Sequence, residues 1–394
     1  MIAEKMMELG KKRSVIREIF EYGNKRRQEI GAENVFDFSL GNPSIPAPDF
    51  VNETMKRLIC EKDSVALHGY TSAQGALPVR QAISNHINER FSIGATPDLL
   101  YMTCGAAASL TITLNAIVNN GDEVIVLAPF FPEYRVFAEK AGAQIKIVKC
   151  RESDLQIDFA ALENAINEKT KAIIVNSPNN PSGVVLSEET IKELAVLLNK
   201  KSEEYGSDIY IIADEPYREL VYGGVEVPYI PSYYDNTVVC YSYSKSLSLP
   251  GERIGYIFVS PRVKNCGDVY AAVCGAGRAL GFVCAPSLLQ YTVAECLGLT
   301  GDISAYEKNR NILYNSLTEY GYTAAKPDGA FYLFIKSPEA DANAFCEKAK
   351  KYELLLVPGD DFGFPGYVRI SYCVSTEMIE KSLPSFKKLI EEYR

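Results

Sequence analysis

Short apolar runs alternate with amphipathic segments through the middle of the chain, from residue 99 to residue 259. The apolar runs are continuous, which indicates strands that are buried on both faces. The segments between them carry apolar positions at helical spacing. This order predicts a mostly parallel, seven-stranded sheet between helices. The expected strands are 99–104, 123–128, 144–148, 172–176, 209–213, 237–242 and 253–259, and the expected helices are 106–118, 133–141, 159–166 and 188–205.

The two ends of the chain predict a second, smaller unit in which helices and strands are mixed. We therefore expect an α/β protein with a large domain on the parallel sheet and a smaller α+β domain from the N- and C-terminal segments. Residues 1–45 are expected to pack with the small domain, 46–285 to form the large domain and 286–394 the small one. Outside residues 99–259, in either domain, the expected helices are 12–30, 51–60, 77–91, 286–296, 305–320, 342–351 and 376–393, and the expected strands are 36–40, 329–335, 354–358 and 367–372.

Composition narrows the class of protein. The chain has 394 residues and a net charge of −9, which argues against nucleic acid or an anionic membrane as the main partner. No apolar run is long enough for a membrane span, and residues 1–12 lack the apolar core of an export signal. The ten cysteines form no C-x-x-C pair and there are only two histidines, so we expect reduced thiols, a cytoplasmic protein and no metal site.

One lysine lies among hydroxyl-bearing residues, directly after an expected strand. Lys245 follows Ser242 and Ser244, and Arg253 comes eight residues later. Burial would lower the pKa of such a lysine and free its amine to act as nucleophile and base. The hydroxyls and the arginine suit a phosphate group. A Schiff-base lysine beside a phosphate site predicts pyridoxal 5′-phosphate (PLP), although the same short pattern also fits a solvated lysine.

Four further polar or aromatic clusters follow expected strands, where the ligands of such sheets bind. Small residues at 103–109 let backbone N–H groups approach an anion, or simply form a tight turn. The loop 176–183 projects Asn180, although a simple turn would contain the same turn-forming residues. Segment 128–134 offers an aromatic ring for stacking, although such aromatic residues also occur in the hydrophobic core. Asp214 comes directly after apolar residues and needs a cation such as a protonated pyridine nitrogen, unless it caps a helix or forms a structural ion pair.

Taken in order, these motifs resemble one family. The sequence G-A-A, F-F-P-E-Y, N-N-P-S-G, D-E-P-Y and S-Y-S-K, followed by an arginine, is similar to the class I/II PLP-dependent aminotransferases of the aspartate aminotransferase fold family. The resemblance covers nearly the whole chain. It implies a ping-pong transfer of an amino group from an L-amino acid to a 2-keto acid, with aspartate as one possible donor.

The resemblance also implies roles for individual residues. Lys245 would form the Schiff base, Asp214 would pair with the pyridine nitrogen, and Tyr217 would reach the ring oxygen. Arg369 would bind the substrate carboxylate. The other implied cofactor contacts are Gly105, Ala106, Ala107, Phe131, Asn180, Ser242, Ser244, Arg253 and Tyr70, and the other implied substrate contacts are Gly41 and Asn180.

Two of the implied contacts concern a second subunit and the substrate side chain. Tyr70 matches a tyrosine that reaches the phosphate from the neighbouring subunit, so a homodimer is expected. Arg278 is our candidate for the distal carboxylate of a dicarboxylic substrate, because it is expected in the loop region where some relatives place such a cation; a solvent or interface arginine is the alternative.

Three other function classes are weighed against an aminotransferase. A PLP-dependent carbon–sulfur β-lyase of the same fold would share all the cofactor motifs. A regulator that uses the fold to bind an effector is disfavoured because Lys245 is intact. A nicotinamide dehydrogenase is disfavoured because the glycines at 275–281 are spaced one residue too widely for a dinucleotide fingerprint. These glycines indicate a tight helix contact or a substrate-side loop.

Overall fold

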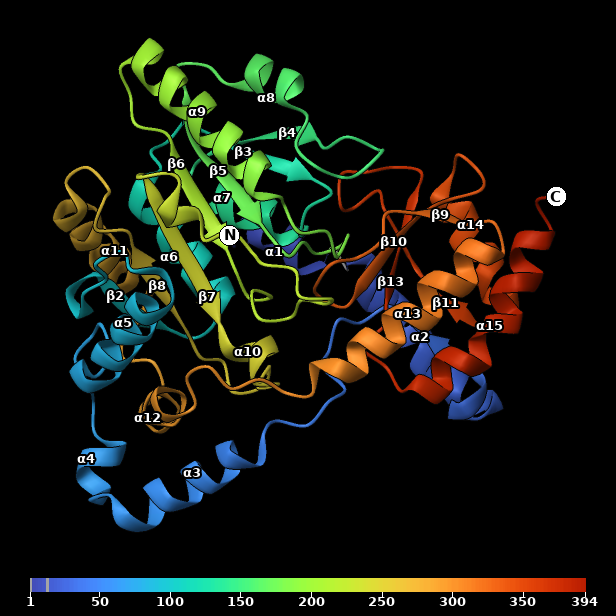
Figure 1. The fold of residues 1–394 in the computed structure, drawn as a ribbon, viewed down its shortest axis with the longest axis horizontal. Helices are drawn as coiled ribbons and strands as arrows, with labels where there is room; N and C mark the ends of the chain where they lie inside the picture. Colours follow the sequence, from blue (N-terminus) through green and yellow to red (C-terminus); the bar gives the residue numbers. More distant parts are fainter. Residues whose placement is uncertain (1, 12–13) are drawn as a thin grey trace.

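A computed structural model describes residues 2–11 and 14–394, and its centre is a seven-stranded sheet. The strand order is β2-β8-β7-β6-β5-β3-β4 (Figure 1). Only β8 runs antiparallel to its two neighbours, and the other pairs are parallel. The predicted mostly parallel sheet is therefore confirmed. Its strands are β2 (Leu100–Thr103), β3 (Glu123–Ala128), β4 (Gln144–Lys149), β5 (Thr170–Asn176), β6 (Tyr210–Asp214), β7 (Thr237–Ser242) and β8 (Gly255–Val259).

Helices flank this sheet, and most have the bounds that the apolar pattern predicts. Strands β6, β7 and β8 are buried at every position because side chains pack on both of their faces. The helices of this domain include α5 (Leu77–Phe91), α6 (Ala106–Ile117), α7 (Glu133–Lys140), α8 (Phe159–Ala165) and α9 (Glu188–Tyr205). Helix α12 (Ser287–Glu295), which follows the expected boundary, packs against α5. No helix of the described chain is long and apolar enough to cross a membrane.

The small domain is built around a second, antiparallel sheet in the order β12-β13-β10-β9. The N-terminal segment joins this domain, because β1 (Phe36–Asp37) pairs in parallel with β11 (Leu354–Leu355). Helix α2 (Val15–Ile30) packs against β12, and the C-terminal helix α15 (Thr376–Glu391) packs against β1 and β11. The other elements are β9 (Thr323–Ala324), β10 (Tyr332–Lys336), β12 (Val357–Pro358), β13 (Tyr367–Ser371), α13 (Ile303–Glu319) and α14 (Ala342–Ala349).

The predicted smaller α+β domain from both chain ends is thus confirmed, with one local correction. The strand expected at 354–358 is divided at Leu356 into β11 and β12, which belong to different sheets. The buried hydrophobic residues form two clusters, one centred on the large sheet and one mostly in the small domain. The domain boundaries at residues 45 and 285 stay predictions.

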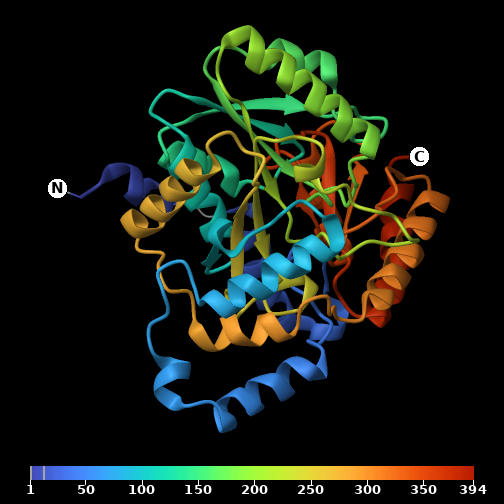
Figure 2. The same ribbon diagram turned by 60° about the vertical axis from the view of Figure 1, so that its left-hand side comes forward.

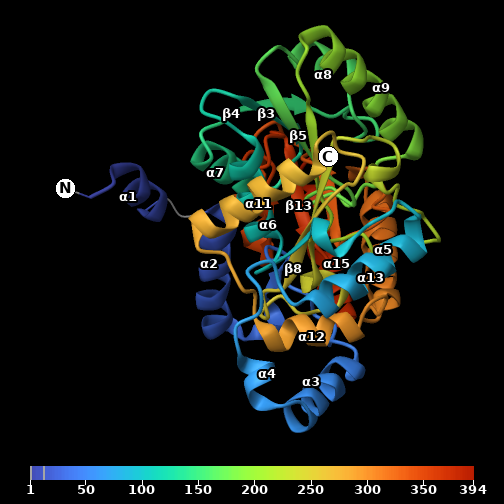
Figure 3. The same cartoon turned by 90° about the vertical axis from the view of Figure 1, so that its left-hand side faces the viewer.

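Several helices lie outside the predicted pattern. The apolar periodicity did not predict α1 (Glu4–Lys11), α4 (Ser64–His68) or α10 (Tyr243–Ser246). Figures 2 and 3 show α1 extending away from the body of the molecule and α3 (Asp49–Glu61) lying at its lower edge. The first two residues of the helix expected at 12–30 lie outside the described residues, and the remainder forms α2.

Gly275 and Gly277 lie in another unpredicted helix, α11 (Cys266–Leu280), and Gly281 caps its C-terminus. This helix packs against α6, and Gly277 faces Tyr101 of β2 so closely that a Cβ atom would lie 2.3 Å from the Tyr101 hydroxyl oxygen. A Cβ atom on Gly275 would have no neighbour within 4 Å. Of the two interpretations of this segment, a tight helix contact is the one observed.

This pair of glycines gives a matched test of packing. Gly277→Ala should lower the thermal midpoint of unfolding, at a cost of about 1–3 kcal/mol, because Tyr101 is fully buried and must shift. Gly275→Ala should leave the midpoint unchanged or raise it, since alanine favours a helix by about 1 kcal/mol over glycine. Equal midpoints for both variants would show that the contact does not require glycine.

Candidate active site

A pocket of about 330 Å³ opens at the edge of the large sheet where three neighbouring parallel strands end. Asn176 ends β5, Asp214 ends β6 and Ser242 ends β7. Because β8 is antiparallel, it begins at this same edge, which places Arg253 beside the others. The predicted site residues that line the pocket are Gly41, Ala106, Ala107, Phe131, Asn180, Asp214, Tyr217, Ser242, Ser244, Lys245, Arg253 and Arg369.

Lys245 projects into this pocket from α10, the short helix that follows β7. The Ser242 side chain caps this helix by accepting a hydrogen bond from the Ser244 N–H. The Lys245 amine donates to the Gly41 carbonyl oxygen at 2.7 Å, and no carboxylate of the described chain forms an ion pair with it. Burial, followed by the nearby charges of Arg253 and Arg369, lowers the pKa of Lys245 to about 8, against the opposing effect of Cys373. The amine is therefore partly uncharged near neutral pH.

Asp214 has one engaged and one unengaged carboxylate oxygen. Oδ2 accepts a hydrogen bond from the Tyr134 hydroxyl, whereas Oδ1 is buried without a partner. Burial raises the pKa of Asp214 to about 7, and the hydrogen bond from Tyr134 opposes this rise. A cationic or protonated group beside Oδ1 would favour the ionised carboxylate.

The opposite end of the pocket is arranged to receive an anion. Helix α6 begins directly after Gly105, and it presents the free N–H groups of its first turn at Ala106 and Ala107. The Ser242 and Ser244 hydroxyl oxygens lie 2.7 Å apart, and Arg253 donates to Ser244 at 3.3 Å. Gly105 has a φ of 89°, and a Cβ atom there would lie 2.6 Å from an Arg253 nitrogen, so this position requires glycine.

Arg369 supplies a second anion site from β13 of the small domain. Its guanidinium is buried, donates to the Asn180 side-chain oxygen at 3.2 Å and to the Ser39 carbonyl, and leaves Nε without a partner. Within residues 2–11 and 14–394, no carboxylate lies within ion-pair distance of it. A buried guanidinium with no counter-charge suits a carboxylate ligand.

A tyrosine pair joins the two halves of the pocket. The hydroxyl groups of Tyr217 and Tyr332 lie 2.8 Å apart, and burial raises the pKa of Tyr217 well above its ordinary value, so the phenol stays neutral. A Cβ atom on Gly41 would lie 2.0 Å from the Tyr332 hydroxyl. Glycine at this position therefore allows the N-terminal segment to approach the pocket closely.

Two predicted site residues lie away from the pocket of this subunit. Tyr70 is 99% exposed. Arg278 is also exposed, and it lies in the last turn of α11 rather than in a loop, which corrects the expected location; a basic residue there interacts favourably with the helix dipole. Hydrogen bonds from Cys284 to Thr71 and Ala73 connect the segments around these residues.

Several residues of the site were not singled out from the sequence. Tyr134 and Asn176 contact Asp214, Tyr332 contacts Tyr217, and Ile16 of α2 lines the pocket. Tyr134 and Asn176 lie in the segments 128–134 and 176–183 that the sequence already indicated, so a signal for both was present. Nothing in the local pattern distinguishes Ile16 or Tyr332 from core residues.

This fold, with its buried lysine, unpaired aspartate oxygen and two anion sites, is that of a PLP-dependent enzyme. Residues 33–386 match the family model for class I and II aminotransferases. The chain is 31% identical over 389 residues to the probable aspartate aminotransferase of Methanocaldococcus jannaschii, covering 96% of this chain and 98% of the relative. The chain belongs to the class I and II aminotransferase family, whose members use PLP.

Solved structures agree with this assignment. An aminotransferase from Eubacterium rectale is 58% identical with a TM-score of 0.98, covering 100% of this chain and 99% of that one. The aspartate aminotransferase of Thermotoga maritima is 29% identical with a TM-score of 0.87, covering 99% and 100% of the two chains. Because the named relatives are aminotransferases, the β-lyase alternative is not favoured.

The residues of the pocket fit PLP on chemical grounds. The free Oδ1 of Asp214 offers a partner for a pyridinium nitrogen, and the cradle of Ser242, Ser244 and Arg253 offers one for a phosphate. Lys245 opens onto the same pocket with an amine of lowered pKa. The two ends of the pocket thus match the two charged ends of the cofactor.

The unpaired Asp214 predicts a pH-dependent stability difference in protein stripped of cofactor. The folded-state pKa of about 7 lies above the ordinary value of 3.8, so the folded protein loses stability as the pH rises through this interval. Asp214→Asn cannot ionise. Its stability advantage over the wild type should therefore be larger at pH 8 than at pH 5 by roughly 2–3 kcal/mol, because this carboxyl is already ionised at pH 5 in the unfolded chain and ionises in the folded chain only near pH 7.

Thermal midpoints at the two pH values measure this difference, and Asp360→Asn, which changes an exposed carboxylate, is the control. A difference between wild type and Asp214→Asn that is the same at both pH values would contradict the buried, unpaired state of this carboxylate.

Proposed function

We propose that this aminotransferase transfers the amino group of an L-amino acid to a 2-keto acid in a ping-pong cycle centred on Lys245. The observation that carries the proposal is that the lowered-pKa amine of Lys245 shares a pocket with the unpaired Oδ1 of Asp214 and with Arg369. These three groups are what such a reaction needs: a base, an anion for the cofactor ring and a cation for the substrate carboxylate.

When bound, PLP supplies a carbonyl carbon that takes up the amino group and a ring that withdraws electrons from the substrate α-carbon. Lys245 acts as the base, because its amine is partly uncharged near neutral pH and can accept the α-proton. Asp214 would hold the protonated ring nitrogen, and Tyr217 would donate a hydrogen bond to the ring oxygen. Phe131, which lines the pocket, would supply an aromatic contact to the ring.

Arg369 orients the substrate. Its guanidinium would receive the α-carboxylate in two parallel hydrogen bonds, with Asn180 beside it and Gly41 bordering the same pocket. The walls around Arg369 are aromatic: its Cζ atom lies 5.0 Å from the centre of the Tyr332 ring and 4.9 Å from that of Phe362. These rings restrict water, which strengthens the carboxylate contact.

A homodimer completes the proposed site. Tyr70 is almost fully exposed, and Val65 (80%) and Leu77 (56%) are exposed near it, which suits a surface covered by a second subunit. Tyr70 would then contact the phosphate bound by the partner. We also propose a cytoplasmic location, which the ten free cysteines support.

Aspartate is the donor that we propose to test first, since the related proteins from M. jannaschii and T. maritima are named as a probable aspartate aminotransferase and an aspartate aminotransferase. Among the described residues, the cations that line the pocket are Lys245, Arg253 and Arg369, and each has another role. The cation for a distal carboxylate would therefore come from the partner subunit. Arg278 is exposed, and Cys284 in the segment after it donates a hydrogen bond to the carbonyl of Thr71, the neighbour of Tyr70, which supports this role.

Arg278→Ala should then lower kcat/KM for aspartate by about tenfold or more and leave kcat/KM for alanine unchanged, because only aspartate has a second carboxylate. Steady-state rates with aspartate, alanine, tyrosine and methionine measure this selectivity. Unchanged aspartate turnover would exclude the proposed role of Arg278.

Lys245→Ala tests the catalytic base. We expect loss of transamination by at least about a thousandfold, because no other amine lines the pocket in the described chain. The measurement is the decay of the cofactor's visible absorption in a single half-reaction with an amino donor. Full turnover by this variant would refute the assignment.

A further inference from the structure

The two oxygens of the Asp214 carboxylate have different surroundings, and this difference has one source. Oδ2 accepts a hydrogen bond from the Tyr134 hydroxyl and lies 3.5 Å from the Asn176 amide nitrogen, while Oδ1 has no partner. The main bond of the Asn176 amide goes to the Asp214 backbone oxygen at 2.9 Å. Tyr134 is therefore the group that decides which carboxylate oxygen is left for a ligand.

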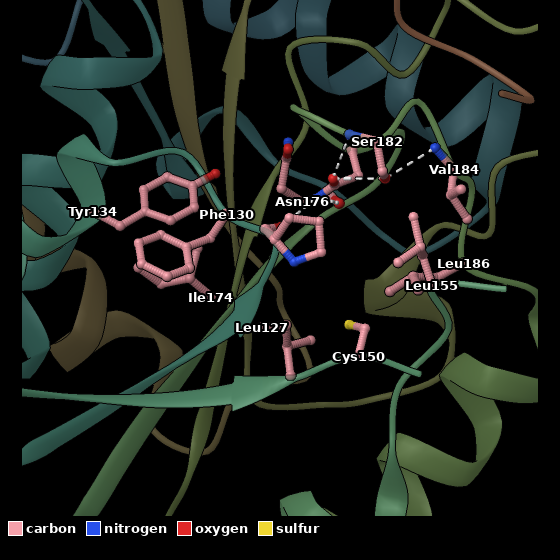
Figure 4. Close-up of a pocket in the computed structure, with 12 residues that line it drawn as sticks. Leu127, Phe130, Tyr134, Cys150, Leu155, Ile174, Asn176, Ser182, Val184 and Leu186 are labelled. Carbon is pink, nitrogen blue, oxygen red and sulfur yellow. Dashed lines mark hydrogen bonds between the residues drawn. The ribbon is translucent and has the colours of Figure 1, made fainter. Parts of the chain in front are cut away.

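Tyr134 is held in place independently of this bond. It lies in the first turn of α7 and is 1% exposed, with its ring against Phe130 (6.5 Å between ring centres) and edge-on to Phe131 (5.7 Å). Figure 4 shows Tyr134 and Phe130 side by side on the wall of a small cavity of about 20 Å³ that Asn176 also lines. The rigid ring presents its hydroxyl at a fixed position.

The electrostatic surroundings of Asp214 make this hydroxyl important. The titratable groups that interact with Asp214 come from three elements. They are Tyr134 of α7, Cys240 of β7, and Glu215 and Tyr217 of the segment after β6. Burial and the negative charge of Glu215 raise the pKa of Asp214, and the Tyr134 hydrogen bond opposes them. The pKa of Tyr134 is itself raised well above its ordinary value by burial, so the phenol keeps its proton and donates throughout the working pH range.

We propose that Tyr134 is a positioning residue that keeps the Asp214 carboxylate ionised and turns its Oδ1 toward the ring nitrogen of the cofactor. This inference rests on the proposed role of Asp214. Without the hydroxyl, the carboxylate would take up a proton more readily and the ring nitrogen would lose its own. Loss of that positive charge would let the nitrogen that links Lys245 to the cofactor hold its proton to a higher pH.

The test uses the PLP-bound enzyme and Tyr134→Phe, which keeps the ring packing and removes only the hydroxyl. We expect the PLP dissociation constant to rise about tenfold, since a hydrogen bond to a charged group is lost. The pH midpoint of the cofactor's visible absorption should move upward by about one unit. The kcat should fall while the KM for the amino donor stays within about twofold, because Arg369 is untouched.

Tyr234→Phe is the matched control. Tyr234 is equally buried, and its hydroxyl donates at 2.6 Å to the Ile209 carbonyl, at the opposite end of β6 from Asp214. This variant should lose thermal stability like Tyr134→Phe but keep the wild-type PLP affinity and absorption midpoint. A second probe, 3-fluorotyrosine incorporated at position 134, keeps the hydroxyl and makes it a stronger donor, so the midpoint should move downward.

The results separate three outcomes. Opposite shifts for phenylalanine and 3-fluorotyrosine support the proposal. A wild-type PLP affinity and absorption midpoint in Tyr134→Phe, with only a loss of stability, would overturn it and leave Tyr134 as a packing residue. Failure of the wild-type enzyme to bind PLP or to transaminate would instead refute the proposed function.

Discussion

Three ionisable groups are buried around one pocket, and no ion pair with another described residue neutralises them; this constraint shapes the site. Lys245 donates its hydrogen bond to a carbonyl oxygen, Asp214 leaves one carboxylate oxygen unengaged, and Arg369 donates to neutral oxygens. Burying unpaired charges is costly, so the folded chain is less stable than it would be with apolar residues at these positions. Ligands that carry the complementary charges recover this free energy on binding.

The fold brings these groups together from three parts of the chain. The ends of β5, β6 and β7 supply the cofactor side, and the reversed direction of β8 adds Arg253 at the same edge. Strand β13 of the small domain supplies Arg369, and the N-terminal segment supplies Gly41 and Ile16. Because the pocket lies between the two domains, a change in their packing would alter the substrate side before the cofactor side.

The large sheet and the cofactor motifs could be predicted because both depend on local sequence. Buried strands appear in the sequence as apolar runs, and the polar residues that follow them fall at one sheet edge because of the geometry of parallel strands.

The hydrogen bond from Tyr134 to Asp214 could not be predicted, since it joins residues 80 positions apart and an aromatic residue after a strand is equally consistent with the core. The division of 354–358 between two sheets depends on tertiary pairing in the same way. Helix α11 was missed because its glycines weaken the helical signal. Tyr70 and Arg278 are exposed in this chain, and the roles proposed for them depend on the proposed homodimer.

The most direct test of the site is to trap the cofactor on the chain. Borohydride reduces the bond between a lysine nitrogen and the aldehyde carbon of PLP to a stable amine, and mass spectrometry of the digested protein locates it. We predict the added cofactor mass on Lys245 and on no other lysine. A trapped cofactor on a different lysine, with Lys245 unmodified, would contradict the site described above.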